Sequence, residues 1–93
     1  MKTKTLHYYA DPAHGWIKVP LKLLKELDIA KEISAFSYSR GDYAYLEEDR
    51  DASLLHEALK SKGITPKYKE FHINKSSKIR NYNSYCARNL FPY

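Results

Sequence analysis

The chain has 93 residues, 43% of them hydrophobic, with nine tyrosines and a formal net charge of +5. This length predicts a single domain that can just bury a core of its own. Cys86 is the only cysteine, which excludes an internal disulfide and a cysteine-rich zinc site and favours a reducing cytoplasm. No apolar run approaches the ~20 residues that span a bilayer, so we expect no membrane partner.

The first third of the chain predicts two strands and a short helix. Residues 6–10 and 16–19 have the apolar content of strands, and the residues between them have the composition of a turn. We expect the helix to begin at Pro20, because the first turn tolerates the missing N–H of proline. A further helical turn is expected over residues 30–33. The apolar stripe of the helix consists of Leu21, Leu23, Leu24 and Leu27.

A hairpin is expected to turn at Arg40-Gly41, since glycine supplies the positive φ that a two-residue turn needs. In that register Tyr38 lies opposite Tyr43 and Phe36 lies opposite Tyr45, so the four rings share one sheet face. The alternate residues are small or aliphatic and share the other face. We expect the helices to pack against the rings, because large apolar patches seldom stay exposed. The alternative is an open recognition surface.

The second half predicts one more helix and one more strand. Asp49 or Asp51 caps the helix, and Gly63 ends it. Residues 66–73 form a strand whose two faces are both mixed, which predicts a position at the sheet edge. The order β-β-α-β-β-α-β predicts an α+β fold: an antiparallel or mixed sheet of about four to five strands with two helices on one face.

We therefore expect two parts. Residues 1–74 form the α+β core domain, and residues 75–93 form a basic, aromatic C-terminal extension that packs on the core or trails from it. The charge is uneven along the chain, with a net −4 in residues 40–59 and a net +7 in residues 60–93. Such a dipolar molecule favours partners that recognise one charged surface.

The acidic segment after the hairpin is a candidate protein-binding surface. Its carboxylates would engage a basic groove, and two tyrosines would anchor the contact. The predicted residues are Tyr43, Tyr45, Glu47, Glu48, Asp49 and Asp51. Helix capping alone explains most of these acids, and the segment lacks the residue order of a calcium loop, so we predict no metal here.

The C-terminal third is a candidate nucleic-acid surface. Cations interleaved with aromatic rings suit phosphates and stacked bases, although a solvated basic surface has the same composition. The predicted residues are Lys67, Lys69, Lys75, Lys78, Arg80, Tyr82 and Arg88.

No catalytic or cofactor motif stands out. His14 near Asp11 has the residue types of a general base with an orienting acid, but no nucleophile or carboxylate pair stands at a recognisable spacing. A loop packed by Trp16 is the simpler interpretation. We therefore predict no enzyme activity and no cofactor.

Four stretches resemble short accessory proteins encoded by phages and other mobile elements. They are residues 11–20 (DPAHGWIKVP), 27–39 (LDIAKEISAFSYS), 41–51 (GDYAYLEEDRD) and 77–85 (SKIRNYNSY). The resemblance implies a genomic setting among anti-restriction and anti-CRISPR functions, in the cytoplasm of a bacterial host cell. It implies no catalytic role, so no functional residues are carried over from it.

Three functions follow as hypotheses. The first is a non-enzymatic inhibitor that binds a host defence protein or nuclease complex stoichiometrically. The second is a DNA- or RNA-binding accessory protein that uses the basic C-terminal third. The third is a sponge that sequesters a signalling nucleotide. A homodimer formed by extension of the sheet at the edge strand is a further expectation.

Overall fold

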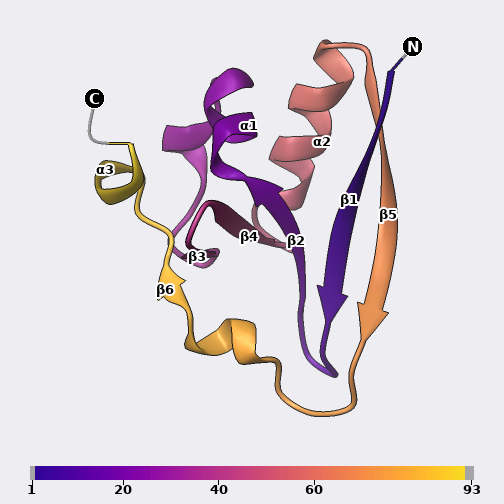
Figure 1. Cartoon of the computed structure of the whole chain (residues 1–93), viewed down its shortest axis with the longest axis vertical. Coiled ribbons are helices and arrows are strands. Elements are labelled where there is room, and N and C mark those ends of the chain that lie inside the picture. Colours follow the sequence, from indigo (N-terminus) through magenta and orange to yellow (C-terminus); the bar gives the residue numbers. More distant parts are fainter. Residues whose placement is uncertain (1, 92–93) are drawn as a thin grey trace.

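The computed structural model describes residues 2–91, and within this range the chain forms one mixed sheet with helices packed against it (Figure 1). Its strands are β1 (Lys2–Ala10), β2 (Gly15–Pro20), β3 (Tyr38–Arg40), β4 (Tyr43–Glu47), β5 (Ile64–His72) and β6 (Asn83–Ser84). Its helices are α1 (Leu21–Glu26), α2 (Ala52–Ser61) and α3 (Ala87–Leu90), with the short 3-10 helices η1 (Ala30–Glu32) and η2 (Lys78–Asn81).

The order of strands across the sheet is β5-β1-β2-β4-β3-β6. β5 runs parallel to β1, and the other neighbouring pairs in the described range are antiparallel. The predicted α+β class is confirmed, and so is the edge position of β5. Six strands form instead of four or five, because the C-terminal residues add β6 at the opposite edge and α3 beyond it.

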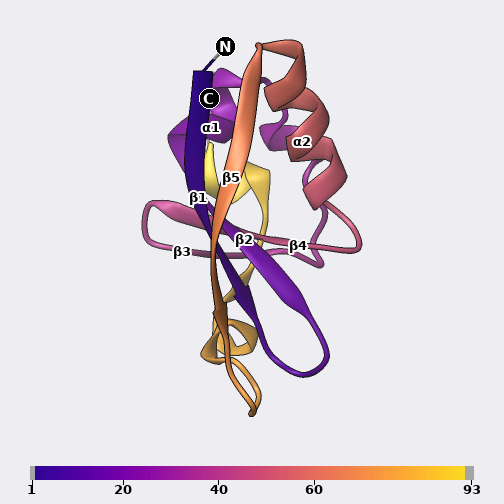
Figure 2. The ribbon, with the colours of Figure 1, turned by 90° about the vertical axis from the view of Figure 1, so that its right-hand side faces the viewer.

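α1 and α2 cover one face of the sheet. Figure 2 shows α2 alongside the twisted pair of β1 and β5. The core between helices and sheet takes alternate residues from the strands, namely Leu6, Ile17, Val19, Ala44 and Leu46, and the leucine stripes of the helices, namely Leu23, Leu24, Leu55 and Leu59. These stripes follow the i, i+3 and i, i+4 spacing that predicted them. The opposite face is left to the C-terminal segment and to solvent.

The β3–β4 hairpin turns at Gly41-Asp42 instead of Arg40-Gly41. This change shifts the pairing of the two strands by two residues. Tyr38 lies opposite Tyr45, and Arg40 lies opposite Tyr43. A shift of two residues leaves each side chain on its original face, so the three tyrosines still share one face. Phe36 is the exception, because it precedes the strand and is 59% exposed.

The prediction that the helices pack against the rings is wrong. The helices pack instead against the hairpin face that carries small and aliphatic side chains, where Ala44 and Leu46 are fully buried. Ser37 and Ser39 on the same side are also buried. Short side chains at these positions let the backbone of the hairpin approach the helices closely, and bulky tyrosines would hold them apart. The ring-bearing face therefore points away from α1 and α2.

Gly41 supplies the positive φ of the hairpin turn, with φ at +60°, and a Cβ there would meet no atom within 4 Å. The change Gly41→Ala thus isolates backbone strain from any steric clash. We expect it to lower the free energy of unfolding by about 1 kcal/mol, measured by urea denaturation. Gly41→Asn should lose less, because asparagine tolerates this conformation better. Equal stability of the glycine and alanine proteins would contradict this turn geometry.

The C-terminal segment crosses the open face of the sheet after β5 ends. Ile79 of η2 is buried against Trp16 and Tyr45. The segment then pairs with β3 through β6, and the Tyr85 N–H donates to the Ser37 carbonyl oxygen at 2.8 Å. In Figure 1 this yellow-orange stretch returns from the lower end of β5 to the edge of β3. Residues 77–85 are therefore packed on the sheet.

Candidate functional site

A row of aromatic rings crosses the open face of the sheet, from β5 to the C-terminal segment. Phe71 stacks on Tyr9 with ring centroids 5.1 Å apart and an interplanar angle of 16°. Tyr9 then contacts Tyr45 at 6.4 Å, and Tyr45 contacts Tyr82 at 5.1 Å. We call these four residues the aromatic row. They belong to β5, β1, β4 and the residue after η2, so only the strand order brings them together.

Cations lie over rings of this face. The Lys18 Nζ lies 4.2 Å from the centroid of the Tyr43 ring. The Arg40 guanidinium lies 5.1 Å from the Tyr82 ring, and the Lys69 Nζ lies 5.7 Å from the Phe71 ring. These cation–π contacts hold positive charge over the faces of the rings. The face thus combines aromatic surface with cations at short spacing.

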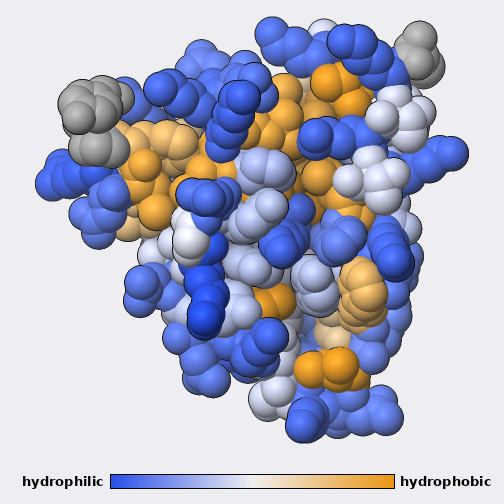
Figure 3. Space-filling view, viewed as in Figure 1, coloured by the Kyte–Doolittle hydropathy of each residue, from blue (hydrophilic) through white to orange (hydrophobic). Residues whose placement is uncertain are grey.

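A cleft of about 620 Å³ opens beside the aromatic row, between the sheet and the C-terminal segment. We call it the basic cleft. Its lining residues from the sheet are Tyr9, Lys18 and Tyr45, and those from the returning segment include Lys75, Lys78 and Tyr82. Large apolar side chains reach the surface nearby at the end of β5, where Phe71 is 37% and Ile73 is 42% exposed. Figure 3 shows apolar areas that interrupt a mostly polar surface on the view of Figure 1.

The Tyr45 hydroxyl stays protonated at neutral pH, since burial and the neighbouring hydroxyls of Tyr82 and Tyr9 raise its pKa above the usual value. A neutral phenol in the floor of the basic cleft both donates and accepts hydrogen bonds. It can therefore serve the edge of a bound base without adding negative charge to the cleft.

The structure brings together most of the residues predicted to bind nucleic acid, but not all of them. Lys67 and Lys69 are exposed on β5, on the face that carries the aromatic row. Lys75, Lys78 and Tyr82 line the basic cleft. Arg80 and Arg88 do not: Arg80 pairs with Asp11, and Arg88 lies on α3, which packs against η1.

The ion pair of Arg80 and Asp11 is a structural tie between the β1–β2 loop and the C-terminal segment. The buried Asp11 carboxylate accepts from Arg80 Nε at 2.7 Å and from Arg80 Nη2 at 3.0 Å. It also accepts from the backbone N–H groups of Ala13, His14 and Ser77. The Arg80 guanidinium, helped by these N–H groups, holds the pKa of the Asp11 carboxyl well below its usual range. Neither member of the pair is therefore free to bind a ligand.

The acidic segment does not present one continuous negative surface, because only part of the predicted protein-binding set is exposed. Glu48 and Asp49 are exposed, whereas Glu47 and Asp51 are 7% and 3% exposed. Of the two predicted anchors, Tyr43 is 39% exposed and Tyr45 is buried.

Asp51 holds the start of the hairpin in place from inside the protein. Its carboxylate accepts from the Ser34 backbone N–H, from the Ser34 hydroxyl at 2.8 Å and from the Ser37 hydroxyl. The Ser37 Oγ in turn accepts from the Glu47 backbone N–H at 2.9 Å. Capping was the expected role of this acid, but its side chain makes no capping hydrogen bond to α2. The carboxylate instead ties the residue before α2 to residues 34–37, at the start of the hairpin.

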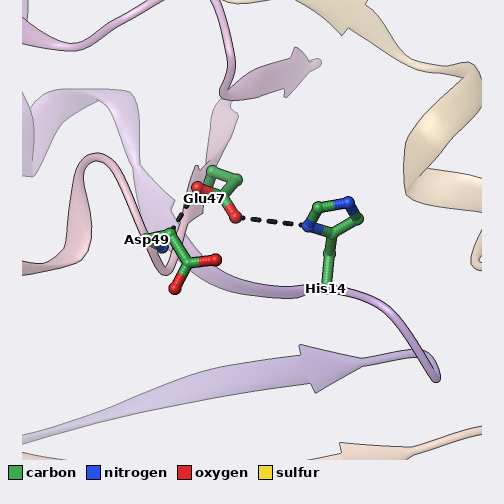
Figure 4. A group of neighbouring side chains, drawn as sticks. All are labelled: His14, Glu47 and Asp49. Carbon is green, nitrogen blue, oxygen red and sulfur yellow. Dashed lines mark hydrogen bonds and ion pairs between the residues drawn. The ribbon is translucent and has the colours of Figure 1, made fainter.

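A second, smaller pocket of about 350 Å³ lies at the other end of the open face. We call it the acidic pocket. His14 from the β1–β2 loop meets Glu47 at the end of β4 and Asp49 just beyond it, and the three side chains point toward one another (Figure 4). Trp16, Phe36, Tyr38, Arg50 and Arg80 complete the lining. His14 thus faces Glu47 and not Asp11, which the sequence had placed near it.

Comparison of the chain with protein families, curated proteins and solved structures gives no match in any of the three. None of the helices in residues 2–91 is long and apolar enough to cross a membrane. The case for a function therefore depends on the geometry of these two sites.

Sequence reasoning missed Tyr9 and Lys18 of the basic cleft, and it missed the meeting of His14 with the acidic segment. A signal existed for the first two. Tyr9 alternates with Tyr8, and Lys18 stands between the core residues Ile17 and Val19, so strand periodicity places both on the face away from the core. No local signal points to the contact of His14 with Glu47, because it depends on the pairing of β2 with β4.

Proposed function

We propose that the protein binds single-stranded nucleic acid in the basic cleft and along the aromatic row. The single observation that supports this most is the continuous path of rings from Phe71 to Tyr82, flanked by cations on both sides. Aromatic side chains stack on bases without sequence preference, and lysines neutralise the adjacent phosphates. A nucleotide chain carries a phosphate next to each base. This face offers rings for the bases and lysines for the phosphates.

A single strand fits this face better than a duplex does. Bases in a duplex are stacked on one another and present only their edges, so the rings of Tyr9 and Phe71 would find no free base face. A single strand exposes its bases and can follow a narrow path over the sheet. The cleft volume of about 620 Å³ also suits one or two nucleotides and is much too small for a duplex.

The charge distribution favours the same surface. Residues 60–93 carry a net +7, and the exposed Lys67, Lys69, Lys75 and Lys78 all lie in this part of the chain, on or beside the open face. Of the exposed acidic residues, Asp49 lines the acidic pocket and Glu48 accepts from the Tyr8 hydroxyl, and neither lines the basic cleft. A phosphate chain therefore approaches the cleft without meeting a carboxylate among its lining residues.

Binding of a labelled single-stranded oligonucleotide, followed by fluorescence anisotropy, should weaken steeply as salt rises. Replacing both Lys75 and Lys78 by alanine should reduce the slope of log K against log salt by about 0.7 for each lost phosphate contact. Tyr9→Ala should weaken binding by about 5- to 150-fold, since one stacked base contributes ~1–3 kcal/mol.

The matched control is the double change of Lys22 and Lys25 to alanine. These lysines are exposed on α1, on the opposite side of the sheet, and removing them lowers the net charge by the same amount. The control should leave the salt slope almost unchanged. No binding at low salt, or equal losses in the two double variants, would contradict the proposal. Competition by mononucleotides at low concentration would point instead to the nucleotide sponge.

Inhibition of a host defence protein or nuclease complex stays a prediction. The residues available for it on the acidic side are the exposed Tyr43, Glu48 and Asp49, which are half of the predicted set. The lack of enzyme activity, the phage setting, the homodimer and the cytoplasmic location likewise stay predictions. Occupation of a nuclease's single-stranded substrate by this protein would connect the first hypothesis with the second.

A further inference from the structure

We propose that His14, Glu47 and Asp49 form a binding site for a divalent transition metal ion of the zinc type. One ligand atom from each residue lies within 4.8 Å of the other two. Figure 4 shows the imidazole and the two carboxylates directed into a common space. One imidazole nitrogen with two carboxylate oxygens is a donor set that Zn²⁺, Co²⁺ and Mn²⁺ accept.

Glu47 provides an independent indication of a missing ligand. Its side chain is buried, and one of its two oxygens, Oε1, makes no hydrogen bond. The other oxygen, Oε2, accepts from the Asp49 backbone N–H at 3.0 Å. The ion-pair contact of Oε1 is His14 Nδ1 at 3.5 Å, and a buried carboxylate oxygen that accepts no hydrogen bond is unfavourable and rare in natural structures. Oε1 is directed at His14, so a cation between these two residues would satisfy it.

The separation of the two groups supports the same interpretation. His14 Nδ1 and Glu47 Oε1 are 3.5 Å apart, which is longer than a good N–H···O hydrogen bond. Two ligands of one tetrahedral zinc ion, each bound at about 2.0–2.1 Å, lie about 3.3–3.4 Å apart. The gap between the two atoms is therefore close to the separation of two ligands that share an ion.

The backbone of two of the three ligand residues is held by hydrogen bonds outside the site. The His14 backbone N–H donates to Asp11 Oδ1 at 2.9 Å, in the loop that Arg80 ties to the C-terminal segment. The Glu47 backbone N–H donates to Ser37 Oγ. Asp49 is exposed and can adjust its side chain toward an ion. The anchored backbone at His14 and Glu47, with the Glu47 side chain oriented by the Asp49 N–H, forms a partly preorganised site.

The remaining coordination position opens into the acidic pocket of about 350 Å³. The cations that line this pocket do not occupy the three ligands. Arg80 is paired with Asp11, and the Arg50 guanidinium lies 4.3 Å from the Phe36 ring. The ion would therefore carry water or an external ligand at this position, as open zinc sites do.

The test is calorimetric titration of the metal-free full chain with Zn²⁺, in a Cys86→Ser background that removes the exposed thiol as a competing ligand. We expect one ion per chain. His14→Ala, Glu47→Gln and Asp49→Asn should each weaken the affinity by at least about tenfold, since loss of a mere supporting group already has an effect of that size. Co²⁺ should give the visible absorption of a tetrahedral site, and Mg²⁺ should compete poorly.

The control is His72→Ala, because His72 forms an exposed pair with Glu70 at 3.0 Å but has no third ligand within residues 2–91. Its Zn²⁺ affinity should equal that of the parent. Circular dichroism without metal shows whether each variant folds, and Asp49→Asn, at an exposed position, keeps the test decisive if Glu47→Gln does not fold. No Zn²⁺ binding in the micromolar range, or unchanged affinity in Asp49→Asn, would overturn the proposal.

Discussion

Replacing Asp11 by alanine is expected to lower the free energy of unfolding by about 3 kcal/mol. The change removes the acceptor of three backbone N–H groups and leaves Arg80 without its partner. The C-terminal segment should also loosen from the β1–β2 loop, since Ser77 and Arg80 both bind this carboxylate. Urea denaturation followed by tyrosine and tryptophan fluorescence measures the loss of stability.

The contribution of Asp11 to the free energy of unfolding should decrease only as the pH falls. Arg80 first, and then the N–H groups, lower the pKa of the folded carboxyl below its unfolded value of about 4. A lowered folded pKa means that the stabilisation is fully present above about pH 4 and is lost as pH falls toward the folded pKa. The stability difference between the parent and Asp11→Asn should therefore be constant around neutral pH and should narrow only in acid.

Asp42→Asn is the matched control, since Asp42 is exposed in the hairpin turn and its side chain forms no ion pair within residues 2–91. It removes the same charge and should leave stability almost unchanged. If Asp11→Ala does not fold, Asp11→Asn carries the comparison, because it keeps a carbonyl oxygen for the backbone donors. Equal stability of Asp11→Asn and the parent at neutral pH would show that the tie to Arg80 adds nothing.

The second large effect is expected for Asp51→Ala, again about 3 kcal/mol. The Asp51 carboxylate is buried and accepts from both the backbone and the hydroxyl of Ser34 and from Ser37. Truncation leaves the buried Ser37 hydroxyl and the half-buried Ser34 donors without this acceptor, which is the costly form of a lost hydrogen bond. Chemical denaturation in a chelating buffer measures this loss without any contribution from metal binding.

Asp49→Ala is the control for Asp51, because it removes an exposed acid two residues away in the same segment. In the chelating buffer it should change stability by less than about 0.5 kcal/mol. A large loss in Asp49→Ala together with a small loss in Asp51→Ala would refute the division of this segment into a buried structural acid and an exposed one.

The sequence predicted the secondary structure more closely than it predicted the sites. The prediction was correct for the leucine stripes of α1 and α2, for the strand at residues 66–73 and for the turn glycine Gly41. It missed the boundaries of elements, and it placed the strand pairing of the hairpin two residues out of register. The ring-bearing face of the hairpin also followed from periodicity. Periodicity did not predict which face the helices cover, because either face of a two-sided strand can receive a helix. Helix packing favoured the face with the small side chains of Ala44 and Ser39.

The candidate sites were predictable only in part. Lys75, Lys78 and Tyr82 were found from the composition of the C-terminal third and do line the basic cleft. Arg80 lies in the same basic part of the chain and was predicted for the same reason. Its ion pair with Asp11 could not be predicted, because the two residues are 69 positions apart in the sequence. The acidic segment suggested a surface, yet two of its carboxylates are buried: Asp51 accepts from Ser34 and Ser37, and Glu47 faces His14.

The amino-acid order by itself determined the helices, the strands, the turns and the two-sided character of each strand. These features depend on neighbours within a few residues, through backbone sterics and the periods of 2.0 and 3.6. Only the tertiary structure decided which sheet face stays open and which distant residues meet, as His14 meets Glu47 and Phe71 meets Tyr9. Those contacts depend on the order of strands in the sheet, and that order is set by the packing of the whole core.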